Sequence, residues 1–268
     1  MLNFADSQNN CSTFDGTELI ECPNIGQDIV TCQKQYGKTI LLSVGGATYT
    51  EAGFTSEDQA IASAEELWAM FGPQQVGSSA LRPFGSAVID GFDFDFETTT
   101  TNTVLFASQL RSLMDTDTSK RYYLTAAPQC PYPDLADDEM LNGAVSFDAI
   151  FVQFYNNYCG IQAFVPGAAA QSNFNFDVWD TWAKTASKNP NVKVLLGVPA
   201  GQTAAGSGYL GVDKLAVVID YCKTFDSFGG VMAWDISQAY ANDGFLPGVR
   251  SSLLAAKRRM VRGMTWRS

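Results

Sequence analysis

The sequence predicts an α/β protein and, within that class, a (β/α)8 TIM barrel. Short apolar strips alternate with helical segments along the chain, which implies parallel strands joined by helical crossovers. No GxGxxG or Walker loop favours a doubly wound nucleotide-binding sheet instead. Polar residues follow several strips, and in a barrel these strand ends build one active site. They are Ser43, Glu97, Gln129, Asn156 and Asp235.

Seven strips have the composition of β-strands, because they are rich in β-branched or aromatic residues and end in polar or Gly/Pro loops. They lie at residues 2–6, 39–46, 87–97, 122–130, 150–157, 192–200 and 229–237. An eight-stranded barrel needs one strand more. Either the first strand lies outside this chain, or one strand has no recognisable strip.

Helical periodicity is clearest in two of the segments between strips, residues 56–72 and 212–225. Each places its apolar residues on one face. These are Ile61, Ala64, Trp68 and Phe71 in the first, and Leu215, Ile219 and Cys222 in the second. The second pattern predicts that Cys222 is a buried free thiol.

Length and composition favour one catalytic domain, residues 1–254, followed by a basic tail, residues 255–268. The chain has 268 residues, of which 46% are apolar, enough for a sizeable core. Its 17 basic and 28 acidic residues give a net charge of −11, which argues against a nucleic-acid partner. No apolar run reaches the length of a membrane span.

The chain contains no histidine, which excludes Ser-His-Asp and Cys-His catalysis and histidine-ligated zinc. Its six cysteines form no CxxC pair, so no metal-binding spacing is present and we expect no cofactor. Cys11 and Cys22 flank a short polar loop and could form a local disulfide, which would imply an oxidising compartment. The alternative is that all six are free thiols.

The segment "DGFDFDFE", residues 90–97, places carboxylates among phenylalanines. Residues two apart on a strand point to the same side, so Asp93, Asp95 and Glu97 share one face and the phenylalanines share the other. With the phenylalanines packed outward against helices, the three carboxylates line the barrel interior. Asp90 has the opposite parity, and we expect it to play a supporting role.

Crowded carboxylates raise the pKa of at least one member, since like charges oppose ionisation. Glu97 stands last in the row, at the expected mouth of the active site. A carboxyl that keeps its proton near neutral pH suits a general acid for glycosidic cleavage. The alternative, a strand edge with solvated acids, fits the interleaved phenylalanines less well.

The segment resembles the DxxDxDxE signature of glycoside hydrolase family 18, the chitinases, on Asp90, Asp93, Asp95 and Glu97. "SVGG" at 43–46 resembles the SxGG strand of that family. "YYLTAAPQCPYPD", "FVQFYNN", "GVPAGQTAAGSGY" and "GGVMAWDIS" resemble later strands of class III chitinases of the plant and fungal type. The resemblance runs from about Leu2 to about Asp235.

The resemblance implies an endo-acting chitinase with a retaining, substrate-assisted mechanism on β-1,4-linked N-acetylglucosamine. Glu97 would protonate the scissile oxygen, and the acetamido oxygen of the substrate would attack the anomeric carbon. Asp95 would orient the acetamido N–H, and Asp93 would share a proton with Asp95. Tyr155 would donate to the acetamido oxygen, and Trp234 would stack against the sugar. Further expected substrate-binding residues are Gln153, Gly46, Ser43, Asn156 and Gln129.

Two features depart from the family pattern. The first strand of the family has no counterpart here, since "LNFADSQNNCS" resembles the second strand, so we expect a barrel without its first β-strand. The basic tail has no family counterpart either. Cys11 with Cys22 and Cys130 with Cys159 look like family disulfides, and Cys32 resembles a cysteine whose partner lies in the absent segment.

Two other functions stay open at this stage. One is a chitin-binding or lectin-like barrel with weakened catalysis, since folds host several functions, although Glu97 is retained. The other is an endo-β-N-acetylglucosaminidase on N-glycans, which would share Asp95, Glu97 and Tyr155. We expect an extracellular monomer that acts on chitin or its oligosaccharides, without a nucleic-acid or membrane partner.

Overall fold

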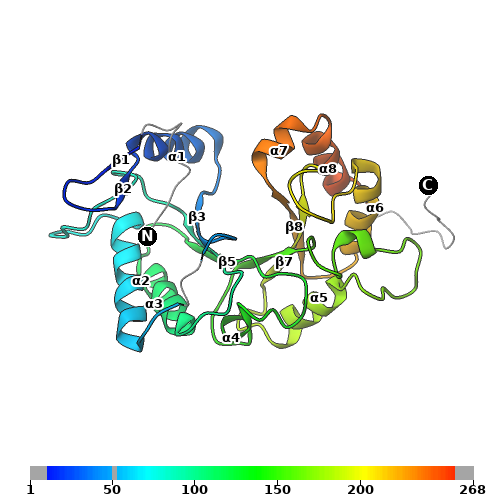
Figure 1. Cartoon of the computed structure of the whole chain (residues 1–268), viewed down its shortest axis with the longest axis horizontal. Helices are drawn as coiled ribbons and strands as arrows, with labels where there is room; N and C mark the ends of the chain where they lie inside the picture. Colours follow the sequence, from blue (N-terminus) through cyan, green and yellow to red (C-terminus); the bar gives the residue numbers. More distant parts are fainter. Residues whose placement is uncertain (1–10, 50–52, 257–268) are drawn as a thin grey trace. The chain divides into compact units, whose positions relative to one another are not determined.

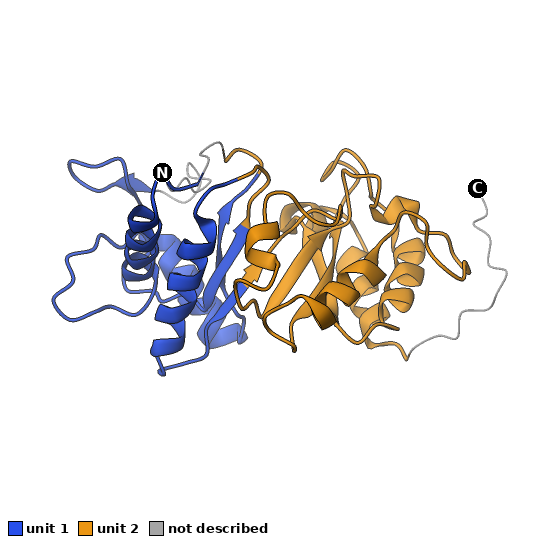
Figure 2. Ribbon diagram, turned by 90° about the horizontal axis from the view of Figure 1, so that it is seen from below, with its two compact units in different colours: residues 1–46, 50–94, 100–124 blue, residues 47–49, 95–99, 125–268 orange. Residues whose placement is uncertain are grey.

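The computed structural model describes residues 11–49 and 53–256. The predicted strand at 2–6 and nearly all of the predicted tail lie outside these residues. The chain divides into two compact units (Figure 2). The first comprises residues 1–46, 50–94 and 100–124, and the second comprises residues 47–49, 95–99 and 125–268.

The first unit contains strands followed by helices, most of which are labelled in Figure 1. Its strands are β1 (Ser12–Thr13), β2 (Ile20–Glu21), β3 (Leu41–Gly45), β4 (Gly91–Asp95) and β5 (Tyr123–Ala126), and its helices are α1 (Pro23–Tyr36), α2 (Glu57–Phe71) and α3 (Thr103–Thr116). Strands β1 and β2 form a short antiparallel hairpin that the sequence pattern missed. The next three are neighbours in the hydrogen-bonded order β3-β4-β5, and β4 and β5 run on into the second unit.

Strand β4 confirms the predicted alternation. The side chains of Phe92, Phe94 and Phe96 are buried. Trp68 of α2 contacts Phe92, with 6.5 Å between ring centroids, and Phe106 of α3 contacts Phe94 at 5.6 Å. The phenylalanines therefore fix the strand through their packing, which leaves the opposite face to the carboxylates.

Asp90, just before β4, plays the supporting role that its parity predicted. Its carboxylate accepts a 2.7 Å hydrogen bond from the Lys120 ammonium and 2.8 Å bonds from the Ile40 N–H and the Gln33 amide. Burial alone would raise the pKa of Asp90, but these bonds hold it below its ordinary value. Asp90 thus ties β4 to the start of β3 within the first unit.

The second unit repeats the strand–helix pattern around parallel strands. Its elements are β6 (Ala149–Gln153), β7 (Lys193–Pro199), β8 (Phe228–Trp234), α4 (Asp138–Leu141), the 3-10 helix η1 (Ile161–Ala163), α5 (Phe176–Thr185), α6 (Val212–Cys222), α7 (Ile236–Ala241) and α8 (Phe245–Leu254). The end of β5 pairs with β6, β6 with β7, and β7 with β8, all in parallel. Six of the seven predicted strands and both predicted helices are therefore confirmed.

Two disulfides are present, as predicted. Cys11 is bonded to Cys22, and Cys130 is bonded to Cys159. The second bridge joins the loop after β5 to the loop after β6, two segments that follow the carboxyl ends of neighbouring strands. Cys32 and Cys222 are free.

The thiol of Cys222 is expected to resist reagents in the native protein. Its side chain is fully buried in α6, and burial raises its pKa. Reagents therefore cannot reach the sulfur, and less of the thiol is in the reactive thiolate form. Cys32, which is partly exposed in α1, provides an internal comparison. We expect disulfide-exchange reagents to label Cys32 in native protein and to label Cys222 only in denaturant. Fast native labelling of Cys222 in a Cys32→Ser variant would contradict its burial.

Candidate active site

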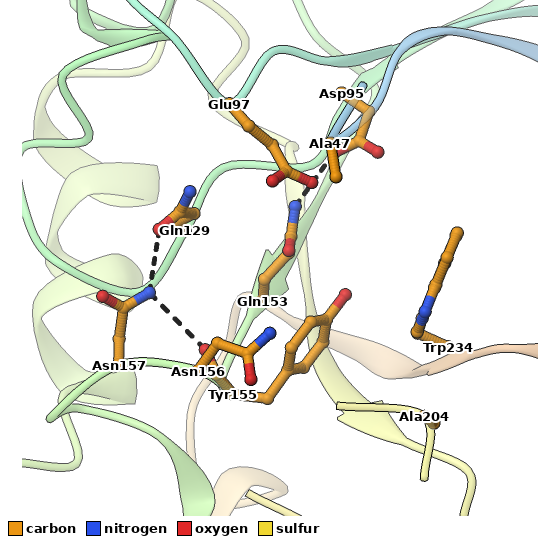
Figure 3. Close-up of a pocket in the computed structure, with 10 residues that line it drawn as sticks. All are labelled: Ala47, Asp95, Glu97, Gln129, Gln153, Tyr155, Asn156, Asn157, Ala204 and Trp234. Carbon is orange, nitrogen blue, oxygen red and sulfur yellow. Dashed lines mark hydrogen bonds between the residues drawn. The ribbon is translucent and has the colours of Figure 1, made fainter. Parts of the chain in front are cut away.

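An open pocket of about 260 Å³ lies in the second unit, at the carboxyl ends of its strands. It brings together seven of the predicted site residues (Figure 3). The lining residues are Ala47, Asp95, Glu97, Gln129, Gln153, Tyr155, Asn156, Asn157, Ala204 and Trp234. Their convergence follows from parallel strands, whose carboxyl ends meet at one edge of the sheet.

Glu97 follows β4 by two residues and is half-buried. Burial raises the pKa of its carboxyl above the ordinary value, and the nearby charge of Asp134 raises it further. Because the carboxyl is in contact with the pocket and holds its proton to higher pH, it suits the role of a proton donor.

Asp95, the last residue of β4, is oriented by Gln153, the last residue of β6. The Gln153 amide nitrogen donates to Asp95 Oδ1 at 2.9 Å and to the Ala127 carbonyl at 2.8 Å (Figure 3). The second bond fixes the amide, so that Gln153 presents its N–H group to Asp95. The bond leaves Asp95 with further oxygen lone pairs that can accept a hydrogen bond from a ligand.

Tyr155 is 6% exposed and its side chain lines the pocket between β6 and the loop after β7. Burial, together with the charges of Asp95 and Glu97, raises the pKa of its phenol well above 10. The hydroxyl therefore stays protonated and can donate a hydrogen bond. Gly208 passes close beside it: a Cβ at Gly208 would lie 2.8 Å from Tyr155 Cβ, and its φ of +101° also favours glycine.

Three amides shape one side of the pocket. Asn157 donates to Gln129 Oε1 at 2.8 Å, so the loops after β5 and β6 meet at the pocket wall (Figure 3). Asn156 has a left-handed φ of 57°, and its Oδ1 accepts from the Gly206 and Ser207 N–H groups at 2.8 and 3.2 Å. Asn156 thus lines the pocket, and its amide oxygen anchors the loop after β7.

Trp234 ends β8 and is 50% exposed, although most large apolar side chains of its unit are buried. The indole lines the pocket together with Tyr155 (Figure 3). The next residue, Asp235, caps α7 through hydrogen bonds from the Ser237 and Gln238 N–H groups, at 2.8 and 3.1 Å. The capped start of α7 thus directly follows Trp234. The exposed face of the indole is suited to the apolar side of a sugar ring.

The other three predicted site residues belong to the first unit. Asp93 of β4 is buried, and its Oδ2 accepts a 2.8 Å hydrogen bond from the Ser43 hydroxyl of β3. Gly46 follows β3 with a φ of +93°, a conformation that favours glycine. The structure therefore pairs Ser43 with Asp93, a contact that the SVGG resemblance did not specify.

Three lining residues, Ala47, Asn157 and Ala204, were not predicted from the sequence. Asn157 is the second asparagine of "FYNN", so the motif that pointed to Asn156 could have pointed to it as well. The two alanines carry no chemical signal. Among residues 11–49 and 53–256, no group of three or more cysteines, aspartates or glutamates could hold a metal ion. Within the same residues, the structure contains no helix with the length and apolar character that a membrane crossing requires.

The pocket combines a carboxyl whose pKa is raised, a second carboxyl oriented by Gln153 and an accessible indole, a set of groups that suits glycoside hydrolysis. A family model for "Glycosyl hydrolases family 18" matches residues 1–209. The chain belongs to glycoside hydrolase family 18.

Named relatives agree with this assignment. The chain is 56% identical over 262 residues to a class III chitinase of Arthroderma benhamiae, a match that covers 97% of this chain and 79% of that protein. It is 51% identical over 254 residues to endochitinase 33 of Trichoderma harzianum, which covers 94% and 78%.

Solved structures share the fold. The ICChI chitinase from Ipomoea carnea superposes with a TM-score of 0.71 at 28% identity, over 90% of this chain and 88% of that chain. The xylanase and α-amylase inhibitor protein XAIP-II from Scadoxus multiflorus gives 0.70 at 31% identity, over 91% and 86%. The predicted α/β class is thus confirmed, and the parallel strands and helices are consistent with the TIM barrel.

Proposed function

We propose that this family 18 glycoside hydrolase is an endo-acting chitinase, which hydrolyses β-1,4 linkages between N-acetylglucosamine units with retention of configuration. The observation that carries the proposal is the placement of Glu97, with its raised pKa, in one pocket with Asp95 and Tyr155. The names of the two fungal relatives, a class III chitinase and an endochitinase, support the substrate.

In the proposed first step, Glu97 gives its proton to the scissile oxygen as the bond to the anomeric carbon breaks. The acetamido oxygen of the same sugar forms a new bond to that carbon. A water then attacks the anomeric carbon, Glu97 accepts its proton, and the acetamido group is released. Two displacements at one carbon retain the configuration, and no second enzyme carboxylate acts as nucleophile.

Asp95 and Tyr155 would hold the acetamido group in the geometry for attack. Asp95 accepts from the acetamido N–H, and its own orientation is supported by the 2.9 Å bond from Gln153. Tyr155 donates to the acetamido oxygen, a role supported by its retained proton. Asp93 would share a proton with Asp95 from the neighbouring inward position of β4, held by Ser43. Holding the reacting groups in place lowers the entropic part of the barrier.

The remaining residues would bind the sugar chain. Trp234 offers the stacking face, and Gln129, Gln153 and Asn156 contribute polar atoms to the pocket wall. The SVGG resemblance suggests that Gly46 and Ser43 also bind the substrate. Ser43 would in addition hold Asp93 through its hydrogen bond.

Replacement of Trp234 by alanine is expected to weaken substrate binding. The half-exposed indole contributes little to the core, so stability should change little. Loss of roughly 80 Å² of sugar-covered apolar surface costs about 2 kcal/mol, or roughly a 30-fold loss of affinity for chitin oligomers. Oligomer binding measured calorimetrically on an inactive Glu97→Gln background gives the comparison. Tyr240→Ala, an exposed aromatic on α7 outside the pocket lining, is the control. Equal losses in both variants would refute the stacking role.

A second candidate function is inhibition of another glycosidase or binding of sugars without cleavage. The likeness to XAIP-II, at 31% identity, favours it. Glu97 argues against it, because an inhibitor or lectin has no use for a proton donor in the sugar pocket.

Hydrolysis of a chitin hexamer, with the products sized by chromatography, tests the proposal directly. Internal cleavage to dimers, trimers and tetramers is the expected result. Binding of the hexamer without cleavage would favour the lectin-like alternative. Faster release of glycan from a high-mannose glycopeptide than of chitin fragments would favour an endo-β-N-acetylglucosaminidase.

We also propose that the protein is an extracellular monomer with residues 1–254 as one catalytic domain and 255–268 as a basic tail. Its two disulfides support an oxidising compartment. The net charge of −11 supports a neutral partner such as chitin rather than a nucleic acid.

A further inference from the structure

Asn157, a half-buried residue of the loop after β6, fixes the orientation of the Gln129 side-chain amide. Asn157 Nδ2 donates to Gln129 Oε1 at 2.8 Å and, more weakly, to the Tyr155 carbonyl at 3.5 Å (Figure 3). A backbone carbonyl can only accept, so the second bond determines which end of the Asn157 amide faces these groups. Gln129 meets that nitrogen with its oxygen, and its own NH2 group points away from Asn157 (Figure 3).

The backbone on both sides of this contact is held in place. Gln129 pairs with Gln153 in a parallel β-bridge. The disulfide between Cys130 and Cys159 begins at the residue after Gln129 and joins its loop to the loop of Asn157. A half-turn of the Gln129 amide would bring two NH2 groups face to face and break the 2.8 Å bond. The pocket wall therefore carries an N–H donor of fixed direction.

This NH2 group is available to a ligand. Gln129 lines the pocket, and no described residue accepts a hydrogen bond from its amide nitrogen. Figure 3 shows the Glu97 carboxyl between the Gln129 amide and the Trp234 indole. In the proposed mechanism Trp234 stacks on the sugar whose acetamido group attacks, and Glu97 protonates the bond to the next sugar. Gln129 therefore faces that next sugar, the one on the leaving-group side.

A donor of fixed direction distinguishes between the groups that a chitin-like chain can carry at this position. A sugar hydroxyl both donates and accepts, so it can bind to either end of an amide. The carbonyl oxygen of an acetamido group can only accept, whereas the ammonium group of a deacetylated sugar can only donate. An NH2 group that is held toward this sugar therefore favours N-acetylglucosamine over glucosamine.

We propose that Asn157 is a positioning residue that turns the NH2 group of Gln129 toward the sugar on the leaving-group side, where this group recognises the acetamido carbonyl. The inference rests on the proposed function and names a specificity within it. The enzyme should cleave preferentially where the sugar that follows the scissile bond is acetylated.

The test is cleavage of partially acetylated chitosan to low conversion, with the ends of the products sequenced by mass spectrometry. The new non-reducing end of each product is the sugar that occupied the leaving-group side. The ratio of acetylated to free-amine sugars at these ends should exceed the ratio in the polymer by about threefold to tenfold, the effect of one hydrogen bond. Equal ratios in the wild type would overturn the proposal.

Two variants remove the donor from this side of the pocket. In Asn157→Asp a carboxylate replaces the donor, so Gln129 turns its NH2 group to that carboxylate and its oxygen to the sugar. In Gln129→Glu the bond from Asn157 remains, and only a carboxylate oxygen faces the sugar. Both variants should abolish the preference for acetylated ends, and either one serves if the other does not fold.

The control is Asn191→Asp, the same substitution at an exposed position before β7, which should keep the preference. The preference is a ratio within one reaction, so a general loss of rate or stability does not change it. Slower cleavage by Asn157→Asp and Gln129→Glu with an unchanged ratio would therefore show a purely structural role and overturn the proposal.

The new reducing ends of the same products separate this inference from the proposed function. Each carries the sugar whose acetamido group attacks, so it should be acetylated in the wild type and in every active variant. Free-amine sugars there would contradict the substrate-assisted mechanism. If these ends are acetylated but Asn157→Asp and Gln129→Glu keep the wild-type preference at the other end, the proposed function holds and the positioning role is wrong. A wild type that cleaves neither chitosan nor chitin would refute both.

Discussion

Glu97→Gln is expected to abolish chitin hydrolysis while leaving sugar binding nearly intact. The amide has the shape of the carboxyl but has no acidic proton to give to the scissile oxygen. Loss of a general acid lowers kcat by about 10³-fold or more. Glu97 is half-buried and packs at the pocket mouth, so the isosteric change should preserve the fold. Initial rates on chitin hexamer and calorimetric binding of the same oligomer give the two readouts.

The matched control for this variant is Glu139→Gln, the same substitution at an exposed position of α4. It should keep wild-type rates. Turnover close to wild type in Glu97→Gln would refute the assignment of the acid. If the variant loses both binding and turnover, Glu97 instead binds the substrate directly or maintains the shape of the pocket.

Removal of the Cys130–Cys159 bridge should strongly destabilise the protein. The two cysteines are 29 residues apart, and cross-linking a loop of that length stabilises the folded state by about 3.5 kcal/mol in the chain-entropy model. The loops it joins carry Gln129 and Asn157, whose 2.8 Å hydrogen bond forms part of the pocket wall. Cys130→Ala combined with Cys159→Ala should therefore also raise KM. Denaturant unfolding measures the first effect and hexamer kinetics the second.

The control for this prediction is Cys222→Ala, which removes one buried sulfur but no bridge. It should cost far less stability than the double substitution. The stabilising role of the bridge would be contradicted if the double variant lost no more stability than Cys222→Ala.

Local periodicity was sufficient to predict most of the framework. The alternation in "DGFDFDFE" placed Phe92 and Phe94 in the core because strand geometry fixes side-chain direction residue by residue. Six strands and two helices followed from similar short-range patterns. The β1–β2 hairpin was missed because two-residue strands are too short to show a period.

The site depended more on contacts between distant segments. The family resemblance supplied the expected roles of Gln153 and Tyr155, and the structure brings both into one pocket with Asp95 and Glu97. Nothing in the sequence indicated that the amide oxygen of Asn156 accepts hydrogen bonds from the Gly206 and Ser207 N–H groups, 50 and 51 residues away. Asp134, whose charge raises the pKa of Glu97, was missed because "PYPD" has the composition of an ordinary turn.

Proton NMR of the first products released from chitin hexamer tests the central claim most directly. Substrate-assisted attack by the acetamido oxygen, followed by water, retains the configuration at the anomeric carbon. The proposed mechanism therefore predicts that the β-anomer appears first and that the α-anomer grows only by mutarotation. Initial release of the α-anomer would show a single displacement by water, and would contradict the mechanism assigned to Glu97, Asp95 and Tyr155.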